Sequence, residues 1–251
     1  MGRGRAPVLS PMDALPPELS HFTLPDLVGV LLLLGVWIGM TLLIENAPRR
    51  WPSTSNLMAD YRREWMVQFV DRDPRIFDSQ VIGQLRQGTS FFASATLIAI
   101  GGALALLGDL ERVIGLAGDL SAGQRPIIVW EVKILLIVLF LVNGFLKFVW
   151  SNRLFGYCAV LMGAVPNQPD HPAALPRARK AAEINITAAR GFNRGLRALY
   201  CALAATAWLL GAYALITAAT ITALVLLRRE FASASRAVLM QPDTAENHTQ
   251  T

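Results

Sequence analysis

Four long apolar segments constrain the fold of this chain more than any other feature of its sequence. They cover residues 27–44, 89–107, 127–150 and 198–227. All 14 prolines lie outside them. The hydrocarbon core of a bilayer is roughly 30 Å thick and takes about 20 helical residues to cross, so each segment is long enough. Because proline would remove a backbone hydrogen bond that lipid cannot replace, its absence favours membrane helices. The sequence therefore predicts an all-α protein, a four-span transmembrane helical bundle.

The composition supports this interpretation and excludes other classes. Apolar residues make up 53% of the chain and charged residues only 16%, below the roughly 25% that is usual in soluble proteins, and the mean hydropathy is +0.42. A soluble fold of this size would have too little charge to cover its surface, and disordered chains are far less apolar. The net charge of +5 would suit nucleic acid, but on so apolar a chain it indicates membrane topology. We expect no nucleic-acid partner.

Cysteine and histidine give no indication of a cofactor. Cys158 and Cys201 are the only cysteines and are too far apart in the chain to form a CxxC pair. The three histidines lie in polar or terminal stretches: His21, His171 and His248. We expect no cofactor, and no metal unless carboxylates alone supply the ligands. No nucleophile elbow, Walker sequence or dinucleotide fingerprint is present, so no motif points to catalysis.

The segments divide the chain into one transmembrane domain and two tails. Residues 1–26 form a proline-rich N-terminal tail, residues 27–235 a single four-helix domain, and residues 236–251 a polar C-terminal tail. The first segment is too long for a signal peptide and no A-x-A site follows it, so we interpret it as a retained anchor. The fourth would be roughly 45 Å long as a helix, and we expect one tilted span, bent near Gly211, that continues into the cytosol.

The distribution of lysine and arginine predicts the orientation of the bundle. Seven basic residues lie between the first two segments, and seven lie between the last two. The N-terminal tail contains two, the middle loop two and the C-terminal tail three. Because basic residues concentrate in cytoplasmic loops, we expect both long loops in the cytoplasm and both termini outside, in a bacterial inner membrane. Arg228 and Arg229, directly after the last segment, count against this orientation.

Each long loop contains a predicted amphipathic cytoplasmic helix. From Ser53 onward, apolar and aromatic residues recur at three- and four-residue steps: Leu57, Met58, Tyr61, Trp65 and Phe69. A second stripe begins after Pro176 and runs into the fourth segment: Ile184, Ala188, Phe192 and Leu196. We expect these helices to form a collar beneath the bundle.

The third apolar segment carries the only charges found inside such a segment: Glu131, Lys133 and Lys147. At about 100° per residue, Lys133, Asn143 and Lys147 share one face of a helix. Because intramembrane charges are costly and usually functional, this polar stripe is a candidate solute path. The alternative is that the lysines snorkel to the two membrane surfaces while Asn143 bonds across the bundle. Glu131 would then reach the outer surface or pair with an arginine of the middle loop.

Two further constellations flank the apolar segments. The first precedes the second segment: Asp71, Arg72, Asp73, Arg75 and Asp78. Its carboxylates suit a divalent cation or general acid–base chemistry, whereas the interleaved arginines favour an ion-pair network that fixes a turn. The second constellation lies at the same cytoplasmic interface: Asn152, Arg153, Asn193, Arg194 and Arg197. Its donors outnumber nearby carboxylates, so we interpret it as an anion or lipid-headgroup site.

Small residues at four-residue steps indicate close helix packing. They lie on the second segment and on the fourth: Ala95, Ala99 and Ala103, and Ala207, Gly211, Ala214 and Ala218. Such stripes let helices approach within one bundle, or between the protomers of a homodimer.

Several stretches resemble one known family. They are LMADYRREWMVQFVDRDPRIFDSQVIGQLRQGTSFFASATLIAIGGALALLG (57–108), EVKILLIVLFLVNGFLKFVWSNRLFGYCAVLMGAVP (131–166), FNRGLRALY (192–200) and RREFASAS (228–235). They resemble the bacterial and plant membrane proteins catalogued as domain of unknown function 599. The resemblance covers most of residues 27–235 and implies a four-span membrane protein, with no assigned reaction, ligand or partner.

These observations favour a non-catalytic membrane component that binds lipid or a partner protein through its basic cytoplasmic collar. The first alternative is a small oligomeric transporter or channel that uses the polar stripe of the third segment. The second is a membrane enzyme that uses the carboxylates at 71, 73 and 78.

Overall fold

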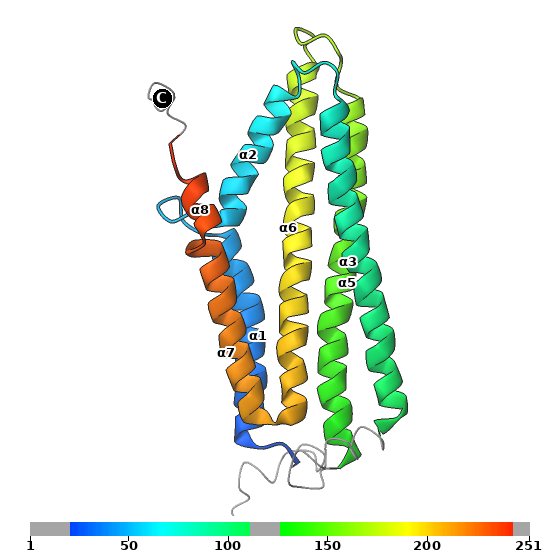
Figure 1. Cartoon of the computed structure of the whole chain (residues 1–251), viewed down its shortest axis with the longest axis vertical. Coiled ribbons are helices and arrows are strands. Elements are labelled where there is room, and N and C mark those ends of the chain that lie inside the picture. Colours follow the sequence, from blue (N-terminus) through cyan, green and yellow to red (C-terminus); the bar gives the residue numbers. More distant parts are fainter. Residues whose placement is uncertain (1–20, 111–125, 243–251) are drawn as a thin grey trace, which may run out of the picture.

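The structure, a computed structural model, describes residues 21–110 and 126–242. The described part is helical and contains no strand (Figure 1). Its helices are α1 (Leu24–Glu45), α2 (Thr54–Gln68), α3 (Ile76–Gly108), α5 (Ile127–Gly163), α6 (Ala174–Thr206), η2 (Ala207–Leu210), α7 (Ala212–Phe231) and α8 (Ala234–Leu239).

Four helices are long and apolar enough to cross a membrane: α1, α3, α5 and the helix that begins at Ala212. This confirms the predicted all-α class and the presence of four candidate spans. Two of the helices extend well beyond the segments predicted to cross. α3 begins at Ile76 rather than at residue 89, and α5 continues to Gly163 rather than ending at residue 150. Hydropathy detects only the part of a helix that is apolar on all sides. The amphipathic extensions of α3 and α5 were therefore not included in the predicted spans.

The fourth apolar segment is not one tilted helix, and this prediction was wrong. α6 ends at Thr206, the short 3-10 helix η2 follows, and α7 begins at Ala212 in the opposite direction (Figure 1). Gly211 makes the turn with φ 136° and ψ 170°, a conformation that is essentially restricted to glycine. The segment contains no charge or proline at this point, so hydropathy alone did not reveal the turn. The predicted small-residue stripe of this segment is divided by the same turn.

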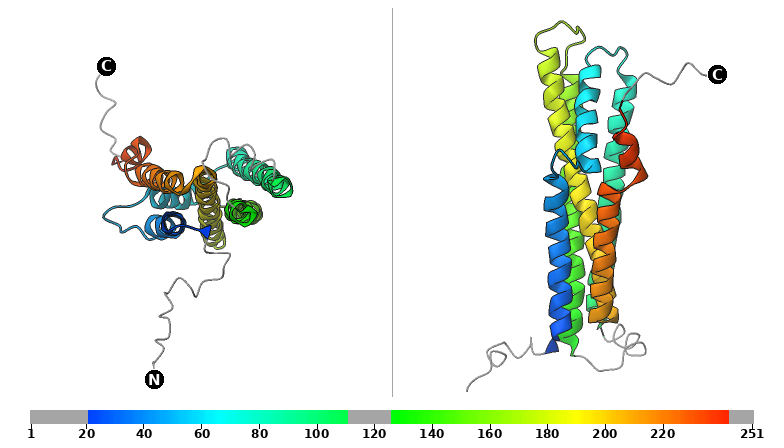
Figure 2. Two further views of the ribbon diagram at one scale, coloured as in Figure 1. Left: turned by 90° about the horizontal axis from the view of Figure 1, so that it is seen from below. Right: turned by 90° about the vertical axis from the view of Figure 1, so that its left-hand side faces the viewer.

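The hairpin makes α6 the central helix of the molecule. Seen from below, α1 and α7 lie on one side of α6, and α3 and α5 lie on the other (Figure 2). α6 packs most extensively on α5 and also contacts α1, α2 and α7. Its C-terminal half lies at the level of the apolar helices, so the described part of the chain passes this level five times, in α1, α3, α5, α6 and α7. The first residues of α1 lie at the lower end of the molecule, and the last residues of α7 lie about half-way up, beside the end of α1, so the two lie on opposite sides of the apolar level (Figures 1 and 2). The two tails themselves fall almost entirely outside the described residues.

Small residues allow α5 and α6 to approach closely. A Cβ atom placed on Gly195 would lie 2.6 Å from Cε1 of Phe148, and one on Gly144 would lie 3.4 Å from the carbonyl oxygen of Gly195. Phe148 is fully buried and stacks on Phe92 of α3 with ring centroids 5.5 Å apart. On α3, by contrast, Ala95 and Ala99 are exposed in the chain. The homodimer suggested by these small residues stays a prediction.

The predicted amphipathic helices are present and form a second core beyond the apolar level. α2 covers the region expected to be helical from Ser53, whose side chain accepts a hydrogen bond from the Asn56 backbone N–H. Met66 and Phe69 are buried against the upper parts of α5 and α6, near Cys158 and Ala178. This upper core fixes α2 against α6 and so places the residues of the candidate site.

Candidate functional site

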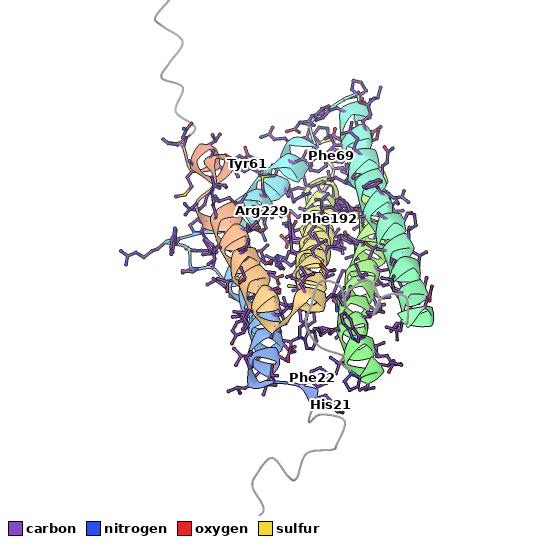
Figure 3. The ribbon with its side chains drawn as sticks, turned by 60° about the horizontal axis from the view of Figure 1, so that its bottom comes forward. His21, Phe22, Tyr61, Phe69, Phe192 and Arg229 are labelled. Carbon is purple, nitrogen blue, oxygen red and sulfur yellow. The ribbon has the colours of Figure 1, made fainter. Side chains whose placement is uncertain are left out.

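A cavity of about 460 Å³ opens between α2, α3 and α7, with α6 as its floor. Three arginines and one carboxylate line it: Arg62, Arg190, Arg229 and Glu230. We call it the basic cavity. Figure 3 shows two of its lining residues, Arg229 at the end of α7 and Phe192 on the neighbouring helix α6.

The basic cavity lies at the level where the apolar helices end. Its lining starts at Thr54, shortly after the end of α1, and includes Ser233 and Ser235 just beyond the end of α7. On α3 it reaches Thr89, the residue at which the predicted second span begins. In a membrane this level corresponds to the headgroup region, where charged protein side chains meet lipid phosphates.

Arg62 enters the cavity from α2 and is half-buried. Its guanidinium donates a short hydrogen bond to Oδ1 of the fully buried Asn185. Asn185 in turn donates to Sγ of Cys158, at 3.6 Å, and so is itself held in place. Burial lowers the pKa of the Arg62 guanidinium from its ordinary value, but an arginine in a protein remains protonated. The Arg62 guanidinium therefore places a fixed positive charge in the cavity, and its hydrogen-bond acceptor, the Asn185 amide, is neutral.

The two other arginines come from α6 and α7. Arg229 lies over the ring of Tyr200, 5.9 Å from its centroid, and donates to the Tyr200 hydroxyl at 3.4 Å. Arg190 is exposed on α6. Among the described residues, none of the three cavity arginines has a carboxylate oxygen within ion-pair distance.

Four other described arginines are compensated by acidic partners. Arg63 pairs with Asp60 and Glu183, and Arg72 pairs with Asp78 at 2.6 Å. Arg194 and Arg197 share the carboxylate of Glu45, with 2.7 Å between Arg197 and its Oε1. Arg75, Arg86 and Arg153 likewise form no ion pair with a carboxylate among the described residues. The basic cavity differs from their surroundings in bringing three such arginines together around one space.

Glu230 is the single acid that lines the basic cavity, and it is only 4% exposed. Its Oε2 accepts hydrogen bonds from the backbone N–H of Ser55, at 3.2 Å, and from the Ser55 hydroxyl, at 3.0 Å. Its backbone carbonyl accepts from the Thr54 hydroxyl at 3.1 Å. These bonds tie the end of α7 to the start of α2.

Part of the cavity wall is apolar. Phe155, Ile186 and Phe192 contribute to its lining. Phe192 also belongs to an aromatic cluster, with its ring centroid 5.5 Å from those of both Phe92 and Phe148. A lining that combines arginines with apolar side chains suits an amphiphile with a negatively charged head.

The polar stripe predicted on the third segment does not form one continuous lining. Lys133 is buried, and its ammonium lies 4.9 Å from the ring centroid of Trp130 and 5.7 Å from that of Trp208. Phe140, the next residue along this face, is fully buried and packs edge-on against Trp37. The end of the stripe that carries Lys133 therefore faces packed aromatic side chains.

The inner end of the stripe lines a separate hollow. Asn143 and Lys147 border a depression of about 300 Å³ between α1 and α5, beside Arg194. Glu131 is half-buried near the start of α5. Arg112 and Arg125 of the middle loop, pairing with which was one of the two alternatives for Glu131, lie outside the described residues.

The predicted headgroup site is not assembled as one group, and the structure corrects this prediction. Asn193 lines the basic cavity, but Arg194 and Arg197 turn to Glu45 on α1. Asn152 and Arg153 lie on the opposite side of α3, in a shallow groove between α3 and α5. Side chains adjacent in a helical sequence point in different directions, so a cluster in the sequence is not a cluster in space.

The acidic constellation forms the structural network that its alternating charges favoured. Asp78 is buried and accepts from both Arg72 and the indole N–H of Trp65, each at 2.6 Å. Arg75 donates to the carbonyl oxygens of Val70, Val165 and Pro166. The carboxylates of Asp71 and Asp73 do not join this network. No group of three metal-ligating side chains occurs within residues 21–110 and 126–242.

The sequence analysis missed the residues that form the basic cavity. Neither Arg62 nor Glu230 was selected as a candidate site residue. One signal was present: Arg229 is one of the two arginines that conflicted with the predicted orientation. The others could not be found, because the four residues come from three helices that converge only in the folded chain.

Comparison with known proteins places the chain in a family. It has no significant match among curated proteins or among solved structures. The model of the family described as "Protein of unknown function, DUF599" matches residues 28–235. This match covers most of the chain and agrees with the resemblance found in the sequence, so the protein belongs to the DUF599 family.

Proposed function

We propose that this protein is an integral membrane component that binds the negatively charged headgroup of a phospholipid in the basic cavity. The observation that carries the proposal is the convergence of Arg62, Arg190 and Arg229 on one cavity that contains a single carboxylate, with no ion pair between these arginines and a carboxylate among the described residues. A guanidinium recognises phosphate oxygens by paired, charge-assisted hydrogen bonds. The net positive lining therefore favours a net negative ligand.

The shape of the cavity supports a lipid rather than a free anion. The apolar wall around Phe155, Ile186 and Phe192 would be of no use to inorganic phosphate. It offers an apolar surface beside the arginines for the first part of an acyl chain. The transport alternative has less support, because buried Phe140 separates Lys133 from Asn143 on the proposed path.

We also propose an orientation in which the chain crosses the membrane five times, with α6 as the additional crossing. The start of α1 then lies outside the cell, and the C-terminal end lies in the cytoplasm. Of the 23 lysines and arginines, only four fall on the outer side: Arg3, Arg5, Arg112 and Arg125. Arg228 and Arg229, which contradicted the four-span orientation, join the basic cytoplasmic side. The basic cavity would face the inner leaflet of a bacterial inner membrane, where anionic lipids attract such clusters.

The orientation can be tested by thiol labelling of intact cells. With Cys158 and Cys201 replaced by alanine, we expect a membrane-impermeant maleimide to label His21→Cys in intact cells but Val238→Cys only after permeabilisation. Both positions are exposed, and Val238 lies on α8 just beyond α7. Labelling of Val238→Cys from outside would support the four-span orientation and contradict five crossings.

The proposed binding can be tested with the unmodified protein. We expect protein purified in mild detergent and incubated with equal amounts of phosphatidylglycerol and phosphatidylcholine to retain the anionic lipid preferentially, as measured by native mass spectrometry. The net positive cavity lining is the physical reason. Equal retention of the two lipids would contradict the proposal.

A further inference from the structure

We infer that Glu230 makes the basic cavity selective for phosphodiester headgroups that carry their own hydrogen-bond donor, and that it excludes phosphate monoesters. This inference rests on the proposed lipid-binding function and deepens it. On this basis phosphatidylglycerol binds better than phosphatidic acid, although phosphatidic acid has the more negative headgroup.

The first step in the argument is the position of the Glu230 carboxylate. It lines the same cavity as the three arginines and is 96% buried within the chain, since its exposed fraction is only 4%. Burial of a carboxylate is costly unless hydrogen bonds or charges compensate it. The two hydrogen bonds from Ser55 and the nearby charge of Arg197 compensate this burial, so the carboxylate can remain charged beside the arginines and meet a bound ligand.

The second step concerns the hydrogen bonds that Glu230 already makes. Both bonds from Ser55 end on Oε2, and Oε1 has no hydrogen-bond donor among the described residues. A carboxylate has about four lone-pair positions, so two acceptor positions on Oε1 remain for a ligand. Helix α2 does not depend on Glu230 for its N-cap, because the side chain of Ser53 caps it by accepting from Asn56.

The third step is the chemistry of the ligand. A headgroup hydroxyl can donate to Oε1 while the phosphodiester lies against the guanidinium groups. A phosphate monoester has a second pKa of about 6, so it carries a second negative charge when the pH is above this value. In the cavity that extra charge would lie near the Glu230 carboxylate with no hydroxyl to donate, and like charges brought together oppose binding.

The test is a competition between the two lipids for the full-length protein. We expect the wild-type protein, in detergent with equal phosphatidylglycerol and phosphatidic acid, to retain about tenfold more of the former, which corresponds to about 1.4 kcal/mol. The Glu230→Gln variant should lose this preference, since an amide neither repels the monoester nor accepts as strongly. The ratio is measured by native mass spectrometry, and thermal unfolding verifies that the variant folds.

Glu183→Gln is the matched control, because it removes an acid from α6 that pairs with Arg63 outside the cavity. It should leave the lipid ratio unchanged. If the role of Glu230 were purely structural, Glu230→Gln would also leave the lipid ratio unchanged, because the amide oxygen still accepts the hydrogen bonds from Ser55. An unchanged ratio in Glu230→Gln, or no preference in the wild type, would therefore overturn the role of Glu230. Failure of the wild type to retain either lipid would overturn the proposed function itself, and the selectivity with it.

Discussion

Replacing Arg62 with glutamine is expected to lower the affinity for phosphatidylglycerol roughly 10- to 100-fold. Hydrogen bonds to charged groups contribute about 1.5–3 kcal/mol, and each 1.4 kcal/mol changes affinity about tenfold. Arg62 is the cavity arginine most firmly held, through Asn185 and Cys158, so little of its binding energy would be lost in ordering the side chain. Titration of lipid into delipidated protein, followed by native mass spectrometry, measures the change.

The neighbouring residue provides a matched control for this variant. Arg63 is on the same helix, but it pairs with Asp60 and Glu183 and does not line the basic cavity. Arg63→Gln removes the same charge one position away and should leave the affinity nearly unchanged. If both variants lose affinity equally, the effect reflects the general positive charge of the surface around α2, and the cavity is not the binding site.

Replacing Glu45 with glutamine is expected to destabilise the fold by up to about 3 kcal/mol, less than for a fully buried ion pair, because the Glu45 side chain is 15% exposed and the Arg194 side chain 44%. Glu45 ends α1 and holds both Arg194 and Arg197 of α6. The Arg197 side chain is only 4% exposed, so its charge could not be hydrated by water once the carboxylate is lost. Reversible unfolding in mixed micelles, monitored by circular dichroism, gives the change in unfolding free energy.

Asp60→Asn is the control for the Glu45 variant. It also removes an arginine partner, but the Asp60 side chain is 77% exposed and its pair with Arg63 lies on the surface. Surface pairs contribute between zero and about 1 kcal/mol, so this variant should unfold almost like the wild type. Equal destabilisation by the two substitutions would show that burial of the α1–α6 ion pair is not what stabilises the bundle.

The predictions for Arg62 and Glu45 both depend on which arginines of this protein pair with a carboxylate and which do not. Arg194 and Arg197 face a carboxylate on a neighbouring helix and so stabilise the contact between α1 and α6. Arg62 faces a neutral amide and a cavity, and its charge is available to a ligand. The sequence analysis placed Arg194 and Arg197 in a binding site because sequence shows which donors are present and not which acceptors meet them.

Local patterns in the sequence predicted the elements of the fold well. Long apolar segments without proline coincide with α1 and with the apolar parts of α3 and α5, because crossing a bilayer requires about 20 predominantly apolar residues whatever their neighbours are. The aromatic stripe from Leu57 to Phe69 likewise corresponds to α2, since helical periodicity depends only on residues three and four apart. The alternating charges before α3 indicated the pairing of Arg72 with Asp78.

Tertiary structure alone decided where the chain turns inside an apolar segment and which charges meet. The turn at Gly211 depends on a backbone conformation that leaves no trace in hydropathy, yet it reverses α7 and moves Arg229 and Glu230 to the level of α2. Glu230 and Ser55 lie 175 positions apart in the chain and form a hydrogen bond only because of that reversal. The sequence by itself determined that this protein has membrane-crossing helices and a basic amphipathic collar, because these properties are local. The basic cavity depends on contacts between distant residues, and only the folded chain brings them together.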